Sequence, residues 1–168
     1  MLIPKTKEKI LKVFFYNPRI PLYVREVSRK ARISTQNAHH YLRNLEEVGF
    51  LSRYKENNRI YFKARTSNPF LIKFFEIFEL ERKLSISSKK KKLYSRIRQV
   101  ENTKTKQALI GLVLSKQKLL ITRSSSSDSN TLTLQQFKQK LSDPNYYNDL
   151  MKQRVVVFGE SVFWELVR

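Results

Sequence analysis

Hydrophobic side chains recur at steps of three and four residues between Ser34 and Gly49. At about 100° per residue, such positions share one face of a helix. The apolar members are Ala38, Tyr41, Leu42, Leu45 and Val48. Ser34 suits the N-cap, because its hydroxyl can accept a backbone N–H that the first turn leaves unpaired, and Gly49 suits the position just after the helix. The pattern predicts an amphipathic helix over residues 34–48.

The outer side of this helix carries hydrogen-bonding and cationic side chains instead of alternating glutamate and lysine. The residues concerned are Ser34, Thr35, Gln36, Asn37, His39, His40 and Arg43. Side chains of these types can form hydrogen bonds with base edges in the major groove. Only Glu46 and Glu47, at the far end, would repel phosphate. We therefore interpret residues 34–48 as a recognition helix, with these seven residues as base-reading candidates.

Two further helices are predicted before the recognition helix. The first begins at Pro4, which suits a first helical turn because its missing N–H costs nothing there, and ends at Asn17-Pro18. The second spans residues 21–31, and a short turn at Arg32-Ile33 follows it. A helix, a tight turn and a second helix with polar outward residues make a helix-turn-helix.

Two segments with strand-like alternation follow the recognition helix. They are Phe50–Lys55 and Arg59–Ala64, and Glu56-Asn57-Asn58 between them predicts a turn, since Asn tolerates a left-handed backbone. A basic hairpin directly after a recognition helix is typical of a wing, here residues 51–64. Its candidates for phosphate or minor-groove contact are Arg53, Lys55, Arg59 and Lys63. A solvated hairpin without a DNA contact is the alternative.

Residues 1–84 resemble the winged-helix domains of archaeal and bacterial transcription regulators of the ArsR and MarR type. The residues that carry the resemblance are Tyr23-Val-Arg-Glu-Val, Ile33-Ser-Thr-Gln-Asn-Ala, Tyr41-Leu-Arg-Asn-Leu-Glu-Glu-Val-Gly-Phe-Leu and Arg59-Ile-Tyr-Phe-Lys. The resemblance implies a winged helix-turn-helix domain, with double-stranded DNA as its partner.

A helix over residues 69–84 is predicted to be unusually rich in apolar side chains. Its members are Phe70, Leu71, Phe74, Phe75, Ile77, Phe78 and Leu84. This is more hydrophobic area than a surface helix packed on one side requires. Packing against the first helix of its own domain is one explanation. We favour a two-fold dimer helix, which the resemblance also implies, because a single half-site seldom gives useful affinity.

The charge of the chain points to a polyanionic partner. The net charge is +20 and the isoelectric point is about 10.3, which favours nucleic acid over a membrane surface. Residues 1–84 contribute +10, residues 85–106 contribute +7 and residues 107–168 contribute +3. We expect residues 85–106 to be a basic linker in which Lys89, Lys90, Lys91 and Lys92 add phosphate contacts. A purely solvated linker is the alternative.

Several classes of chemistry are not expected. The chain has no cysteine, which removes disulfides, thiolate zinc sites and cysteine nucleophiles. His39 and His40 are neighbours on a helix and cannot face one metal as an i, i+4 pair would, so no metal site and no cofactor is expected. No apolar run of about 18 residues and no signal-peptide pattern occurs, so we expect a cytoplasmic protein without a membrane partner.

Residues 107–168 are predicted to form a small α/β module. Ala108–Leu114, Lys118–Thr122 and Val155–Phe158 are apolar runs typical of buried strands. Thr133 and Asp143 are suited to cap helices. Gly159 leads into a last helix whose apolar residues are Phe163, Trp164 and Val167. The fold class is therefore α+β, with a winged helix-turn-helix domain, a long helix and basic linker, and this module.

The end of the chain resembles archaeal fusions of a winged helix with a minimal nucleotidyltransferase domain. The residues concerned are Leu134-Gln-Gln-Phe-Lys, Arg154-Val-Val-Val-Phe-Gly-Glu and Phe163-Trp-Glu. Catalysis in such domains needs a Gly-Ser turn for phosphate and an Asp-x-Asp pair for Mg²⁺, and the sequence has neither. We expect no catalytic residue and no enzyme activity, and a module that binds a protein or small-molecule partner or stabilises a dimer.

The leading hypothesis is a sequence-specific, DNA-binding regulator of transcription. One alternative is an inactive nucleotidyltransferase-like protein, or a toxin–antitoxin type of partner, that uses the winged helix for targeting. Another is a general chromatin or RNA-binding protein, since net charge alone fits both.

Overall fold

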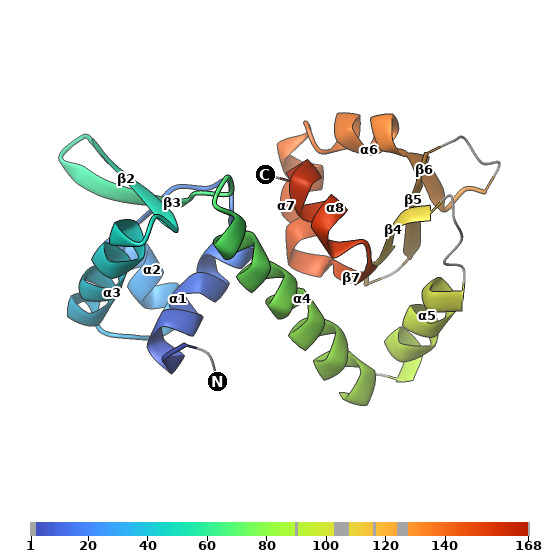
Figure 1. Ribbon diagram of the computed structural model, residues 1–168, viewed down its shortest axis with the longest axis horizontal. Coiled ribbons are helices and arrows are strands. Elements are labelled where there is room, and N and C mark those ends of the chain that lie inside the picture. Colours follow the sequence, from blue (N-terminus) through green and yellow to red (C-terminus); the bar gives the residue numbers. More distant parts are fainter. Residues whose placement is uncertain (1–2, 90, 103–107, 116, 124–127, 168) are drawn as a thin grey trace. The chain divides into compact units, whose positions relative to one another are not determined.

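A computed structural model of the chain describes residues 3–89, 91–102, 108–115, 117–123 and 128–167. The chain divides into two compact units, Met1–Phe75 and Glu76–Val167. The boundary falls inside one continuous helix, α4 (Pro69–Lys89), whereas we expected the first domain to end at residue 84. Both units combine helices with a sheet (Figure 1), which confirms the α+β class.

Three helices form the base of the first unit, and they follow the predicted hydrophobic pattern. They are α1 (Lys5–Tyr16), α2 (Val24–Ala31) and α3 (Thr35–Glu47). Their inward residues are buried: Ile10, Leu11, Phe14, Phe15, Val27, Ala31, Ala38, Leu42 and Leu45. Val48 differs from the prediction, because it is the C-cap of α3 and its side chain is exposed.

The second helix begins three residues later than the sequence pattern indicated. Leu22 and Tyr23 form a short strand, β1 (Leu22–Tyr23), opposite Phe62 and Tyr61. Leu22 and Phe62 are both buried, so cross-strand packing overrides a local helical pattern that is weak at its first turn.

The predicted wing is present. Strand β2 (Leu51–Glu56) pairs with β3 (Arg59–Ala64), and the three-stranded antiparallel sheet has the order β1-β3-β2. Asn57 and Asn58 join the two strands with φ angles of 47° and 58°. Two consecutive left-handed residues match the twist of a hairpin, which confirms the turn predicted from these asparagines. The first unit is a winged helix-turn-helix domain.

The second unit contains a four-stranded mixed sheet with the order β6-β5-β4-β7. Its strands are β4 (Ala108–Val113), β5 (Lys118–Thr122), β6 (Thr131–Thr133) and β7 (Val155–Phe158). Only the β5–β6 pair is parallel. Every residue of β7 is buried, so this strand is covered on both faces. The three longer strands confirm the prediction from the apolar runs, and β6 was not predicted.

The helices of the second unit after α4 are α5 (Lys91–Asn102), α6 (Leu134–Lys140), α7 (Pro144–Gln153) and α8 (Glu160–Val167). Of these, α6 and α7 begin directly after their predicted caps, Thr133 and Asp143. Thr133 Oγ1 accepts a hydrogen bond from the Gln136 backbone N–H at 3.2 Å, and Asp143 Oδ1 accepts one from Asn145 at 2.8 Å. The predicted core residues of α8 are buried: Phe163, Trp164 and Val167.

The segment expected to be a basic linker is largely helical. Residues 85–89 end α4, and residues 91–102 form α5. Ile97 and Val100 of α5 are buried against Val113 and Val155 of the sheet. The helix therefore has one apolar face. The sequence did not indicate this face, because positively charged residues are so frequent in the segment.

An ion pair lies in the interior of the second unit. Arg154 Nε donates a hydrogen bond to Glu79 Oε1 at 2.6 Å, and both side chains are fully buried. The guanidinium lies 5.3 Å from the ring centroid of Phe163 and 5.1 Å from that of Trp164. Burial raises the pKa of Glu79, and the neighbouring Arg154 opposes that shift. The pair joins α4 to the end of α7 and to α8.

Candidate nucleic-acid interface

The turn between α2 and α3 is fixed by hydrogen bonds of Ser28. Its hydroxyl donates to the Ile33 carbonyl at 2.8 Å and lies 3.5 Å from Thr35 Oγ1. Arg32, in the turn, adopts a left-handed backbone with φ 55°. Ser28 is buried, and the sequence pattern gave no sign of this role. The turn sets the direction in which α3 leaves α2.

Ser34 caps α3 as its sequence position predicted. The backbone N–H of Asn37 donates to Ser34 Oγ at 3.2 Å, and the backbone at Ser34 is extended. This hydrogen bond uses one acceptor position of the Ser34 hydroxyl. The main role of Ser34 is therefore to start the helix.

The outward face of α3 presents the candidate base-reading side chains to solvent. Ser34 and the six candidates that follow it are exposed: Thr35, Gln36, Asn37, His39, His40 and Arg43. The opposite face is anchored by fully or almost fully buried Ala38, Leu42 and Leu45. The His40 ring contacts the half-buried Tyr41 ring edge to face, at a centroid distance of 5.1 Å. The helix thus presents amide, imidazole, hydroxyl and guanidinium groups on one side.

The four predicted wing cations are exposed but lie on two faces of the sheet. Arg59 and Lys63 share a face, since residues two apart on a strand point the same way. Arg53 and Lys55 of β2 are opposite Phe62 and Ile60 of β3 and therefore lie on the other face. Arg53 Nε also donates to Glu46 Oε1 of α3 at 3.0 Å. The wing can therefore present positive charge on both sides.

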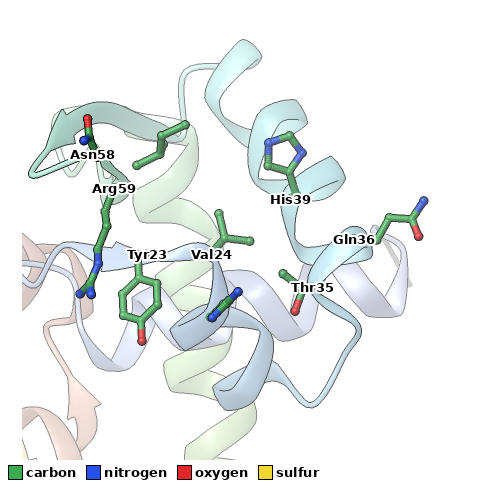
Figure 2. A pocket seen from close by; sticks show the side chains of 9 residues that line it. Tyr23, Val24, Thr35, Gln36, His39, Asn58 and Arg59 are labelled. Carbon is green, nitrogen blue, oxygen red and sulfur yellow. The ribbon is translucent and has the colours of Figure 1, made fainter.

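A cavity of about 600 Å³ separates α3 from the wing. It is lined by Thr35, Gln36 and His39 of α3, by Tyr23, Val24 and Arg25, and by Asn58, Arg59 and Ile60. Figure 2 shows the Arg59 side chain extending from the wing toward the Tyr23 ring, and its guanidinium carbon lies 5.7 Å from the ring centroid. Polar and cationic groups from α2, α3, β1 and the wing therefore surround one hollow.

Sequence reasoning missed three side chains beside this hollow. Tyr23 and Arg25 line it, and Tyr61 contacts Tyr23 with ring centroids 6.2 Å apart. Tyr61 lies on the same face of β3 as Arg59 and Lys63, since residues two apart on a strand point the same way. The contribution of Tyr23 depends on β1, which the sequence did not reveal.

The lysine run falls mostly outside the described part of the chain. Lys89 ends α4, and Lys91 and Lys92 begin α5. Lys90 and the side chains of residues 87–92 are not described. The proposed phosphate contacts of these lysines remain a prediction from the sequence.

Among the described residues, no group of three or more histidine, aspartate or glutamate side chains is arranged to hold a metal ion. Within the same residues, no helix combines the length and the apolar character that a membrane span requires.

The chain matches no protein-family model and no curated protein sequence. Three similar solved structures illustrate its likeness to known folds. One is MepR, a transcription regulator of the Staphylococcus aureus multidrug efflux pump MepA, at 17% identity and a TM-score of 0.43 over 60% of this chain and 76% of that chain. A MepR mutant bound to an oligodeoxyribonucleotide gives 17% identity and a TM-score of 0.41 over 60% and 75%.

The third is Sso10a-2, a DNA-binding protein from Sulfolobus solfataricus. It gives 23% identity and a TM-score of 0.38 over 58% of this chain and 96% of that chain.

Proposed function

We propose that this protein is a regulator of transcription that binds a specific sequence in double-stranded DNA. The exposed face of α3 carries the proposal, because it groups hydrogen-bonding side chains that suit base edges. Arg43 is suited to guanine, and Gln36 and Asn37 are suited to adenine. Thr35, His39 and His40 complete the proposed reading surface. The acidic residues of α3, Glu46 and Glu47, lie in its last turn.

The charge of the first unit supports binding to a polyanion. Residues 1–75 contain 16 basic and 5 acidic side chains, for a net charge of +11. Contacts from cations to phosphate position a protein on the duplex without reading its sequence. We assign this role to Lys55, Arg59 and Lys63 of the wing, and to Arg53 when it is released from Glu46.

We propose that the protein acts as a homodimer through α4. Four large apolar side chains of this helix are exposed: Phe70 at 71%, Ile77 at 40%, Leu80 at 51% and Leu84 at 60%. Phe70, Ile77 and Leu84 are spaced seven residues apart, as in a helix that pairs with another helix.

The residues expected on this surface are partly different from those found there. Leu71, Phe75 and Phe78 are buried, and the Phe74 ring contacts Phe50 at a centroid distance of 5.7 Å. Packing within the protein therefore uses Leu71, Phe74, Phe75 and Phe78. We propose that the exposed apolar residues contact a second copy.

Selection of duplexes from a random library tests the proposed function. We expect the purified protein to enrich one motif, with two inverted half-sites separated by about 10 base pairs or a multiple of that. Recovery of unrelated sequences with equal affinity would contradict sequence-specific binding and favour a general nucleic-acid-binding protein.

A further inference from the structure

Three tyrosines form one row across the sheet of the first unit. Tyr61, on the central strand β3, is directly opposite Tyr23 of β1 on one side and Tyr54 of β2 on the other. Directly opposed residues of antiparallel strands project from the same face. We call these three residues the tyrosine row.

The rings of the tyrosine row contact one another. Tyr54 and Tyr61 are stacked, with centroids 5.6 Å apart and planes inclined by 17°. Tyr23 contacts Tyr61 edge to face, with centroids 6.2 Å apart. The neighbouring positions along the strands belong to the opposite face, where Leu22 and Phe62 are buried in the core. The tyrosine row therefore lies on the solvent side of the sheet.

Tyr54 has an accessible aromatic surface. It lies on β2, an edge strand, and its side chain is 39% exposed. Because Tyr61 stacks on one side of its ring, the other side is directed toward the sheet edge. A planar group placed there would continue the stack that Tyr61 and Tyr54 begin.

Positive charge flanks the tyrosine row. Arg59 and Lys63 lie two residues before and after Tyr61 on the same strand, and therefore on the same face. Both are exposed. Glu56, opposite Arg59, is the acidic residue of this face. Aromatic rings beside cations are the groups with which proteins hold unpaired bases and their phosphates.

We propose that the tyrosine row binds unpaired bases of single-stranded DNA, with one base stacked on Tyr54 and Arg59 and Lys63 bound to the flanking phosphates. Bases of a duplex already stack on each other, so an aromatic ring face is suited to an unpaired base. At about 4.8 Å between strands, the row spans roughly two to three nucleotides.

The choice of DNA rests on the proposed function. Tyr23, a member of the tyrosine row, and Arg59, which flanks the row, both line the cavity beside α3. Figure 2 shows these two side chains at that cavity. A strand held by the tyrosine row would therefore adjoin the proposed duplex-binding surface. The lining of that cavity contains Tyr23 but neither Tyr54 nor Tyr61, so stacking on Tyr54 can be tested separately from base reading by α3.

The alternative explanation is that the tyrosines only stabilise the hairpin. Cross-strand aromatic pairs contribute to sheet stability in many proteins. Binding and folding must therefore be measured on the same variants. Tyr54→Phe keeps the aromatic ring, whereas Tyr54→Thr removes it and keeps a residue suited to a strand.

The test measures fluorescence anisotropy of the whole protein with a labelled oligothymidylate of about 12 nucleotides. We expect Tyr54→Thr to weaken this binding about 5- to 150-fold, the range for loss of one base-stacking contact. Tyr54→Phe should bind as the unchanged protein does. Equal binding by Tyr54→Thr and the unchanged protein would overturn the proposal, as would loss of binding that merely follows a lowered melting temperature.

Two further probes separate this inference from the proposed function. Tighter binding of an oligouridylate than of an oligothymidylate of equal length would overturn the assignment to DNA. A duplex selected by the protein should bind Tyr54→Thr nearly unchanged, whereas Gln36→Ala should weaken the duplex and leave the oligothymidylate unaffected. If no duplex is selected but binding of the oligothymidylate still depends on Tyr54, the proposed function is wrong. Single-strand binding by the tyrosine row is then still supported.

Discussion

Arg53 of the wing donates from Nε to Oε1 of Glu46 on α3 at a distance of 3.0 Å. The two residues are seven positions apart in the sequence, and the interaction ties the last turn of the proposed recognition helix to β2. Both side chains are partly exposed, so the pair adds little to stability. Its consequence is electrostatic, because one wing cation is already paired when DNA arrives.

We predict that Glu46→Gln strengthens binding to duplex DNA. The change removes a negative charge and releases Arg53 for a phosphate. Each additional phosphate contact steepens the dependence of log affinity on log salt by about 0.9. The measurement is duplex affinity over a series of salt concentrations.

Glu47→Gln is the matched control for this prediction. Glu47 accepts a hydrogen bond from Asn44 at 3.5 Å, so the change removes the same charge from the next position without releasing an arginine. An equal effect of the two variants would show that Arg53 gains no phosphate contact.

The local patterns of the first unit were sufficient to predict most of its elements. The period of the apolar residues identified α3, and Ser34 and Gly49 marked its limits because capping depends on one residue and its nearest neighbours. The wing followed from alternation on both sides of Asn57-Asn58. These signals are encoded within a few consecutive residues.

Features that depend on distant partners were not predicted. Strand β1 has two residues, and its pairing with β3 comes from residues almost forty positions away. The tyrosine row depends on that pairing. Helix α5 was mistaken for a linker because its buried Ile97 and Val100 are few beside its charges. The proposed base-reading residues were located on an exposed face, but their contacts require DNA.

We predict that α4 mediates dimerisation through its exposed apolar side chains. Leu80→Glu places a charge within the stripe formed by Phe70, Ile77 and Leu84 and should convert the protein to a monomer. Sedimentation equilibrium at micromolar concentration measures the change. Arg29→Glu, which changes the charge of an exposed residue of α2, is the control. It should leave the molecular mass measured by sedimentation unaltered. A monomeric unchanged protein would refute this prediction.

The lysine run should contribute affinity without sequence preference. Changing Lys89, Lys90, Lys91 and Lys92 to glutamine should flatten the salt dependence by about 0.9 for each lysine that contacts a phosphate. Preference between selected and scrambled duplexes should stay the same, since phosphate contacts carry no sequence information. Lys138→Gln in α6 provides a control for loss of positive charge elsewhere. An unaltered slope would make the run a solvated segment.

The buried ion pair of the second unit should be sensitive to loss of either partner. Glu79→Leu or Arg154→Met alone should lower the free energy of unfolding by about 3–5 kcal/mol, because the remaining charge stays buried without its partner. The double variant should recover most of this loss. The free energy of unfolding of each variant is measured by urea unfolding, monitored through the fluorescence of Trp164, the single tryptophan.

A partly exposed pair provides the comparison for this prediction. Lys12 and Glu8 form an i, i+4 ion pair on α1, with the lysine side chain 37% exposed. Lys12→Met should change the free energy of unfolding by less than about 1 kcal/mol. Single variants of the buried pair that unfold as the unchanged protein does would contradict the predicted cost of leaving one charge buried without its partner.

Reading of bases by α3 is the central claim, and Gln36→Ala tests it most directly. This change leaves the net charge unaltered, so attraction to phosphate stays the same. The measurement is the dissociation constant for a selected duplex and for a scrambled duplex of equal length and composition. We predict a loss of about 1–3 kcal/mol on the selected duplex and no change on the scrambled one. Equal weakening on both duplexes, or none on either, would contradict base reading by this residue.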